Sequence, residues 1–378
     1  MKTIRSDFKS IQLDSQGFSK NAQDSQDIDL TFGEPSQSTH EDIKAEAIKH
    51  IIRNDTLYAP AAGILPLRQA ISDSYRLRNN VHYDVDEITV TNGATQSLTA
   101  VLLTILNVGD EVIVPKPCFM LYEPTVQLAR GTVVEYSTID DDFQINREKL
   151  EALITPKTKA IIYTSPGNPT GTLYNEESDR IMVEIAEKYG IFVICDDIYE
   201  LITFKPIHPL YLHQEIRKNI IICQSFSKSY AMTGWRMGWV IADRSISDDI
   251  TRACLIMVTA VSTPSQYAAV KCFDIDNTYL VNEFKDHCDY TCQRLDEMKL
   301  PYVQPEGAFY VFPDISEFKR SSREFAEEAA RQFNVRVLDG YRFGSESDDH
   351  IRISYVCTKE RLIEGLDRLK AYVDSLRL

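Results

Sequence analysis

The stretch "NIIICQSFSKSYAMTGWRMG", residues 219–238, joins a run of isoleucines to a polar turn in which Lys228 stands between two serines. An unbroken apolar run is typical of a strand that is covered on both faces of a sheet. The turn supplies hydroxyls, an amine and the guanidinium of Arg236, and residues 225–238 contain no carboxylate that could pair with Lys228. The stretch therefore indicates a buried strand followed by a turn, in which Lys228 is available for a chemical reaction.

Four shorter apolar runs precede this strand: "ITVT" (88–91), "EVIVP" (111–115), "KAIIYT" (159–164) and "IFVICDD" (191–197). Amphipathic segments with helical spacing separate several of them, as in "EESDRIMVEIAEKYG". Alternating strands and helices predict an α/β fold with a mostly parallel sheet and helices on both of its faces.

The pattern changes after Pro264 to long helical stretches up to about residue 299, followed by a short mixture of strands and helices. We therefore expect a large domain over residues 41–280 and a smaller α+β domain over residues 281–378. Residues 1–40 are expected to form an arm that joins the smaller domain. The large domain should begin with a helix from about residue 41, one face of which carries Ile43, Ala47, Ile48, Ile51 and Ile52.

The composition excludes several classes of protein. Of the 378 residues, 43% are hydrophobic and 26% are charged, which is typical of a soluble globular protein with a sizeable core. The net charge of −15 opposes binding to nucleic acid or to an anionic membrane. The longest apolar stretch, "AVLLTIL" at 100–106, is too short to cross a bilayer, and the N-terminus does not resemble a signal peptide.

The eight cysteines form no CxxC pair, which favours reduced thiols in a cytoplasmic protein. Cys288 and Cys292 lie one helical turn apart beside His287, but a second pair of ligands is missing from the sequence nearby. We therefore expect no metal site.

Four polar clusters follow predicted strands: "TNGATQ" (91–96), "SPGNPTG" (165–171), "DDIYE" (196–200) and "SFSK" (225–228). Ligands of open α/β sheets bind beyond the carboxyl ends of the strands. Four such clusters on one edge therefore predict a single site.

The residue types in these clusters indicate the ligand. Gly93, Ala94 and Thr95 open a helix, where unpaired N–H groups suit a phosphate. Three further donors could reach the same phosphate: Ser225, Ser227 and Arg236. Lys228 could form an imine with an aldehyde, and Asp196 could hold a ring nitrogen protonated. Phosphate, aldehyde and pyridine nitrogen together describe pyridoxal phosphate.

Further motifs extend this pattern over nearly the whole chain: "FGEP" (32–35), "YAPAAGILPLRQAI" (58–71), "PKPCFMLYEP" (115–124), "GAFYVFP" (307–313) and "RISY" (352–355). In this order the chain resembles the class I and II aminotransferases, which are fold-type-I pyridoxal-phosphate enzymes. The resemblance implies a large domain with a mostly parallel seven-stranded sheet and a smaller α+β domain. It also implies transfer of an amino group from an L-amino acid to a 2-oxo acid by a ping-pong mechanism.

The resemblance implies a role for each matching residue. Lys228 matches the lysine that forms the internal aldimine with the cofactor and then moves the substrate proton. Asp196 matches the partner of the pyridine nitrogen, Tyr199 and Asn168 match the donors to the ring oxygen, and Phe119 matches the aromatic residue stacked on the ring.

The remaining matches concern the phosphate, the substrate and the partner subunit. The phosphate site matches Gly93, Ala94, Thr95, Ser225, Ser227 and Arg236. Arg352 matches the arginine that grips the substrate α-carboxylate, assisted by Asn168 and the backbone of Gly33. Tyr58 matches a tyrosine that reaches the cofactor phosphate of the other subunit, so the resemblance implies a homodimer.

Two alternative functions remain open in the sequence. A C–S β-lyase would use the same fold and cofactor, and a regulator would bind a ligand on this fold without catalysis. The retained Lys228 and Arg352 and the absence of an added DNA-binding segment disfavour the regulator. No pattern in the sequence fixes the substrate side chain. The resembled subgroup includes aromatic and acylated-diaminopimelate aminotransferases, which implies aromatic or broad specificity. The segment "LDGYRFG" (338–344) has Asp339 where the family usually has proline, and the effect of this change is open.

Overall fold

The computed structural model describes residues 27–378, and its largest sheet has seven strands in the order β2-β8-β7-β6-β5-β3-β4. These strands are β2 (Ile88–Thr91), β3 (Glu111–Lys116), β4 (Thr132–Ser137), β5 (Thr158–Tyr163), β6 (Phe192–Asp196), β7 (Ile220–Ser225) and β8 (Gly238–Ile241). Strands β4, β3, β5, β6 and β7 run parallel, whereas β8 is antiparallel to both of its neighbours, β7 and β2. The prediction of a mostly parallel seven-stranded sheet is confirmed.

Helices cover both faces of this sheet, which explains the continuous apolar strands. They are α3 (Leu65–Asn79), α4 (Ala94–Ile105), α5 (Tyr122–Leu128), α6 (Arg147–Glu151), α7 (Glu176–Tyr189), α8 (Arg244–Val258) and α9 (Thr263–Lys271). Successive strand residues point to opposite faces. Ile161 belongs to the core shared with α3, α7 and α9, and its neighbour Ile162 belongs to the core shared with α4, α5 and α8.

The strand register brings distant polar segments to one edge of the sheet. Gly238 at the start of β8 pairs with Thr91 at the end of β2 and with Ser225 at the end of β7. The turns that follow β2 and β7 therefore lie side by side, because the strand between them runs in the opposite direction.

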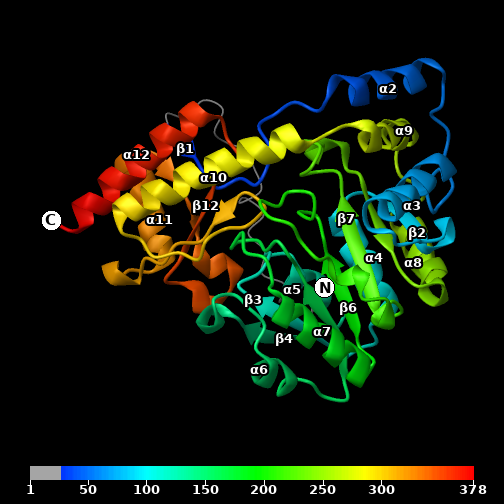
Figure 1. Ribbon diagram of the computed structural model, residues 1–378, viewed down its shortest axis with the longest axis horizontal. Coiled ribbons are helices and arrows are strands. Elements are labelled where there is room, and N and C mark those ends of the chain that lie inside the picture. Colours follow the sequence, from blue (N-terminus) through cyan, green and yellow to red (C-terminus); the bar gives the residue numbers. More distant parts are fainter. Residues whose placement is uncertain (1–26) are drawn as a thin grey trace, which may run out of the picture.

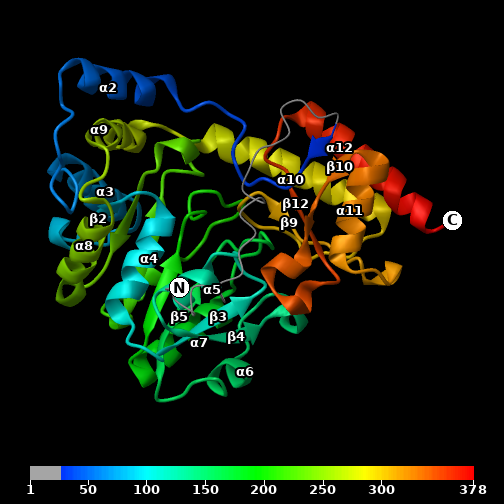
Figure 2. The same cartoon turned by 180° about the vertical axis from the view of Figure 1, so that it is seen from behind.

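The C-terminal part of the chain gathers around a separate hydrophobic core, beside the sheet in both views (Figures 1 and 2). Its helices are α10 (Thr278–Met298), α11 (Ser322–Phe333) and α12 (Lys359–Leu376). Its short strands are β9 (Tyr310–Val311), β10 (Val335–Arg336), β11 (Leu338–Asp339) and β12 (Ile351–Ser354). The N-terminal strand β1 (Ile28–Asp29) pairs with β10, and Ile28 and Leu30 are buried in this core. The rest of the expected arm, residues 1–26, lies outside the described residues.

Helix α2 (Glu41–Ile52) starts where the sequence predicts, but only part of its expected apolar face is covered. Ile43 and Ala47 are buried, whereas Ile48, Ile51 and Ile52 are between 53% and 74% exposed. The helix lies at the periphery and packs chiefly against α9 (Figure 1), and these isoleucines stay exposed among residues 27–378.

Within residues 27–378, no helix combines the length and the apolar composition that crossing a bilayer requires.

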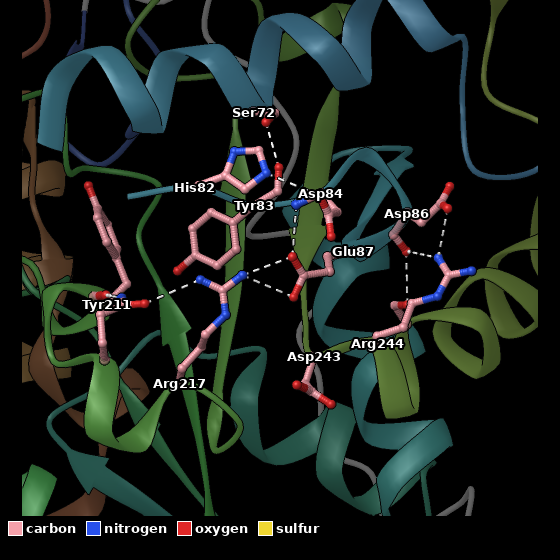
Figure 3. A network of polar contacts seen from close by, with 12 residues as sticks. Ser72, His82, Tyr83, Asp84, Asp86, Glu87, Tyr211, Arg217, Asp243 and Arg244 are labelled. Carbon is pink, nitrogen blue, oxygen red and sulfur yellow. Dashed lines mark hydrogen bonds and ion pairs between the residues drawn. The ribbon is translucent and has the colours of Figure 1, made fainter. Parts of the chain in front are cut away.

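A polar network ties the segment before β2 to the segment before β7 at the edge opposite the polar turns. Figure 3 shows Arg217 between Tyr83 and Glu87. One guanidinium nitrogen of Arg217 donates to both carboxylate oxygens of Glu87, at 2.8 and 3.1 Å, and the guanidinium carbon lies 4.4 Å from the centre of the Tyr83 ring. The Glu87 side chain is only 10% exposed, so this pair is shielded from water.

This network predicts unequal effects of two similar substitutions. Glu87→Gln should lower the free energy of unfolding by about 1–3 kcal/mol, because it removes a charge-assisted hydrogen bond from a buried site. Asp86→Asn, which weakens the exposed pair with Arg244 in the same network, should change it by less than about 1 kcal/mol. Urea unfolding followed by circular dichroism measures both. Equal losses in the free energy of unfolding would show that burial of the Glu87–Arg217 pair adds nothing to stability.

Candidate active site

A cavity of about 540 Å³ lies where the carboxyl ends of β5, β6 and β7 meet the C-terminal part of the chain. The predicted site residues that line it are Gly33, Phe119, Asn168, Asp196, Tyr199, Lys228, Arg236 and Arg352. Residues that are far apart in the sequence thus meet in one space, because the strands end at a common edge.

Lys228 follows the end of β7, and its amine donates a hydrogen bond to the backbone oxygen of Gly33. Burial and the positive charge of Arg352 lower the pKa of Lys228 to about 8, although Glu34 and Asp196 favour the charged form. A lysine ordinarily titrates near 10.4. The environment therefore makes a neutral, nucleophilic amine available close to neutral pH.

Asp196, the last residue of β6, presents one satisfied and one unsatisfied carboxylate oxygen. Tyr122 donates to its Oδ2 at 2.6 Å, whereas Oδ1 is buried without a hydrogen-bond partner among residues 27–378. Burial raises the pKa of Asp196 to about 6, and the hydrogen bond from Tyr122 opposes this rise. The free oxygen suits a protonated ring nitrogen, so the site fits a pyridine cofactor.

Sequence analysis did not identify Tyr122, although it lies within the quoted segment "PKPCFMLYEP". Its hydroxyl also lies 2.7 Å from Thr164 Oγ1, and its ring meets Phe119 edge to face. Tyr122 therefore orients Asp196 and supports Phe119 at the same time.

Arg352 on β12 is buried beside the same cavity. One of its terminal nitrogens donates to Asn168 Oδ1 at 2.8 Å, and the other donates to the backbone oxygen of Thr31. Its guanidinium carbon lies 4.4 Å from the ring centre of Tyr310. These contacts fix the plane of a buried cation that pairs with no carboxylate among residues 27–378, as an anion site requires.

Tyr199 and Tyr310 form a second pair, of which only Tyr199 was predicted as a site residue from the sequence. Their hydroxyls lie 3.0 Å apart in a buried position, and Tyr310 belongs to the motif "GAFYVFP". A Cβ atom on Gly33 would lie 1.7 Å from the Tyr310 hydroxyl. A side chain at position 33 would therefore displace Tyr310, which explains the glycine.

The N-terminus of α4 lies next to the guanidinium of Arg236. Gly93 caps the helix with φ +80°, and a Cβ atom there would lie 2.5 Å from Nη2 of Arg236. Ala94 and Thr95 follow in the first turn, and Thr95 is exposed. Free N–H groups and a guanidinium thus meet at one point, which suits a phosphate.

The predicted serines lie on the neighbouring strand end. Ser225 donates from Oγ to Ser227 Oγ at 2.8 Å and accepts from the backbone N–H of Ser227 at 3.0 Å. Gly238, which pairs with Ser225, lies so close to α4 that a Cβ atom would be 3.1 Å from the nitrogen of Ala94. The structure therefore places the predicted phosphate residues around one spot beside the cavity.

Tyr58 and Asp339 do not line the cavity of their own chain. Tyr58 is 87% exposed. Asp339, where the resemblance expects proline, accepts a hydrogen bond from Arg342 Nε at 2.7 Å. The preceding residue, Leu338, lines the cavity, so this departure lies next to the site.

Comparison with known proteins agrees with this geometry. The sequence model of the family "Aminotransferase class I and II" matches residues 25–369. A probable N-acetyl-LL-diaminopimelate aminotransferase of Bacillus subtilis is 35% identical, over 92% of this chain and 89% of its own length.

Solved structures show the same fold. The aspartate aminotransferase of Thermotoga maritima superposes with a TM-score of 0.88 at 32% identity, covering 92% of each chain. The aromatic aminotransferase of Pyrococcus horikoshii gives 0.90 at 32% identity, covering 93% of this chain and 97% of its own. The chain therefore belongs to the class I and II aminotransferase family and is a pyridoxal-phosphate-dependent aminotransferase.

Proposed function

We propose that this aminotransferase takes an amino group from an L-amino acid with an aromatic or other apolar side chain and passes it to a 2-oxo acid. The observation that carries the proposal is the meeting of Lys228, Asp196 and Arg352 in one cavity. The apolar lining of that cavity supports the choice of side chain and comprises Phe119, Met120, Ile198 and Leu338.

Lys228 and Asp196 carry the chemistry in this proposal. When bound, pyridoxal phosphate supplies an aldehyde and a protonated ring that accepts the electron pair released at the substrate Cα. Lys228 would hold the aldehyde of the bound cofactor, and its released amine would accept and return the proton at the substrate Cα as a general base and acid. Asp196 would keep the ring nitrogen protonated through Oδ1, which has no hydrogen-bond partner among residues 27–378. Tyr199 and Asn168 donate to the ring oxygen.

Other residues position the cofactor and the substrate. Phe119 stacks on the ring. Arg352, held by Asn168, grips the substrate carboxylate, and the backbone N–H of Gly33 assists. The phosphate is bound by Gly93, Ala94, Thr95, Ser225, Ser227 and Arg236. Fixing both ends of the substrate holds its Cα–H bond in the orientation that favours proton removal.

A panel of amino donors tests this function. With 2-oxoglutarate or pyruvate as acceptor, phenylalanine, tyrosine and leucine should react faster than aspartate, because Phe32, Met120 and Leu338 give the cavity apolar lining. Each turnover should consume one oxo acid, and Lys228→Ala should reduce the rate by several orders of magnitude.

The same assay separates the alternative C–S lyase. Cystathionine supplied without an oxo acid should give no sustained release of pyruvate, ammonia and thiol. Sustained release under these conditions would contradict the aminotransferase proposal. A strong preference for aspartate would contradict the proposed aromatic or apolar side chain of the amino donor, but not the aminotransferase activity.

We further propose a homodimer in which Tyr58 reaches the cofactor phosphate of the other subunit. Tyr58 lies away from its own cavity and belongs to an exposed group of large apolar and aromatic side chains. This group comprises Ile48, Ile51, Ile52, Leu57, Tyr58 and Leu65. A second copy of the chain would cover these side chains, and exposed large apolar side chains of this kind are typical of an interface.

Hybrid dimers test the shared site. Lys228→Ala and Tyr58→Ala each should impair activity, and mixing the two chains under exchange conditions should restore about half of the wild-type activity per hybrid. One site of the hybrid then carries both defects and the other carries neither. If Tyr58 served its own chain, both hybrid sites would be defective and mixing would restore nothing.

Two further features belong to this proposal. We assign residues 41–280 to a large domain and residues 281–378 to a small domain joined by the arm 1–40, on the basis of the separate C-terminal core that also holds Ile28 and Leu30. We also assign the protein to the cytoplasm, which fits the free thiols of all eight cysteines.

A further inference from the structure

A second cavity, of about 440 Å³, lies at the same end of the sheet but shares no lining residue with the active-site cavity. Thr164 and Asp196 line the active site, whereas their neighbours Tyr163 and Asp197 line the second cavity. Successive residues at a strand end point to opposite faces. The second cavity therefore lies on the opposite face of the sheet, beside α7.

Asp197 is the unusual residue of this cavity. It is 6% exposed, and within residues 27–378 its carboxylate forms no hydrogen bond or ion pair. The nearby Glu200 differs, since its oxygens accept from Tyr211 at 2.5 Å and from Gln224 at 3.1 Å. Neither carboxylate oxygen of Asp197 is among the fully enclosed unpartnered atoms of the described residues, so both reach the space of the cavity.

The charge around this cavity favours a cation. The charged or titratable side chains that line it, tyrosines aside, are Glu176, Asp179, Asp197, Glu200, Lys205 and His208. Lys205 is paired with Glu306 and Glu200 is paired with Arg78, and neither of these partners lines the cavity, so both charges are balanced. Asp179 accepts a hydrogen bond from Tyr163. Carboxyl groups thus dominate the lining, and Asp197 is the one of them that is both buried and unpartnered in the described chain.

Burial and the neighbouring Glu200 raise the pKa of Asp197 well above its usual range, and Asp196 acts in the same direction. Burial also raises the pKa of Asp179. This rise favours the protonated form of Asp197 when no cation is bound. A bound cation would favour the ionised form, so its binding should release a proton.

We propose that this cavity binds a small organic ammonium ion with an aromatic or apolar body, whose N–H group donates to Asp197. Leu173, Tyr174, Ile207 and Leu210 provide apolar surface for that body. The volume falls within the range of small-molecule sites. A metal ion fits less well, since the described residues contain no group of three or more His, Cys, Asp or Glu side chains arranged to hold one. The proposal does not depend on the transamination chemistry.

The test uses the holoenzyme and N,N-dimethyl-2-phenylethylamine, which is a cation at pH 7. As a tertiary amine, it cannot form an imine with the cofactor aldehyde. Titration calorimetry in two buffers with different heats of ionisation should show one saturable site per chain and release of protons on binding. The cofactor absorbance should not change. Asp197→Asn should weaken binding about tenfold or more, because it removes a buried charge-assisted contact.

Two controls separate this site from general charge attraction. Glu176→Gln removes the same charge from the exposed wall and should change the affinity less than about threefold. The neutral probe 2-phenylethanol should bind about tenfold more weakly than the amine. Ile207→Trp, which fills the cavity, should abolish binding and does not rely on Asp197→Asn folding.

Several outcomes would overturn the proposal. These are the absence of saturable binding at millimolar amine, an unchanged affinity in folded Asp197→Asn or Ile207→Trp, equal binding of the alcohol, or binding without proton release in the wild type. A change in cofactor absorbance on binding would place the amine in the active site and would also contradict it.

Discussion

The amine of Lys228 lies in a cavity that limits its contact with water, with the positive charge of Arg352 nearby, and this placement is the constraint on which the site depends. A buried ammonium near another cation loses solvation and gains repulsion, so its neutral form becomes accessible. The two charges come from different parts of the fold. Lys228 follows a strand of the large sheet, whereas Arg352 lies on β12 beside the C-terminal core. Packing between these parts therefore sets the reactivity of the lysine.

Hydrogen bonds keep the cations in place. Arg352 is fixed by Asn168 after β5 and by the backbone of Thr31 near the N-terminal strand, so three segments of the chain converge on one guanidinium. On the other side of the cavity, Tyr122 occupies one oxygen of Asp196 and leaves the second without a partner in the described chain. Asp196 therefore has one oxygen that fixes its position and a second oxygen that is available to a ligand.

Much of this arrangement could be predicted because most strands of the large sheet are short, continuous apolar runs. "ITVT" at 88–91 has the predicted bounds, Asp196 ends a strand as expected, and Lys228 follows the end of another. Strand β4 was missed because it lies at the edge of the sheet, where its residues are largely exposed or half-buried. Strand β8 was missed because it is short and begins directly after a turn. The exposed isoleucines of α2 show that an apolar helix face predicts a packing contact but does not identify the partner.

Side chains whose role depends on a distant partner could not be recognised in the same way. Tyr122 and Tyr310 have the pattern of core residues until their hydroxyls are seen beside Asp196 and Tyr199. Asp196 and Asp197 are adjacent and chemically identical in the sequence. Only the face of the sheet to which each points assigns one to the active site and the other to the second cavity.

The most direct test of this account is the titration of Lys228 in the cofactor-free enzyme. Trace acetylation from pH 6 to 11, with mass spectrometry of the Lys228 peptide, reports the fraction of neutral amine, and an added lysine peptide that titrates near about 10.4 serves as the reference. The account predicts a pKa of about 8 for Lys228, with labelling that rises through that pH. Arg352→Gln should shift the midpoint upward, because loss of a nearby positive charge favours the ammonium form. A midpoint for Lys228 equal to that of the reference peptide, or one unchanged by Arg352→Gln, would contradict the account.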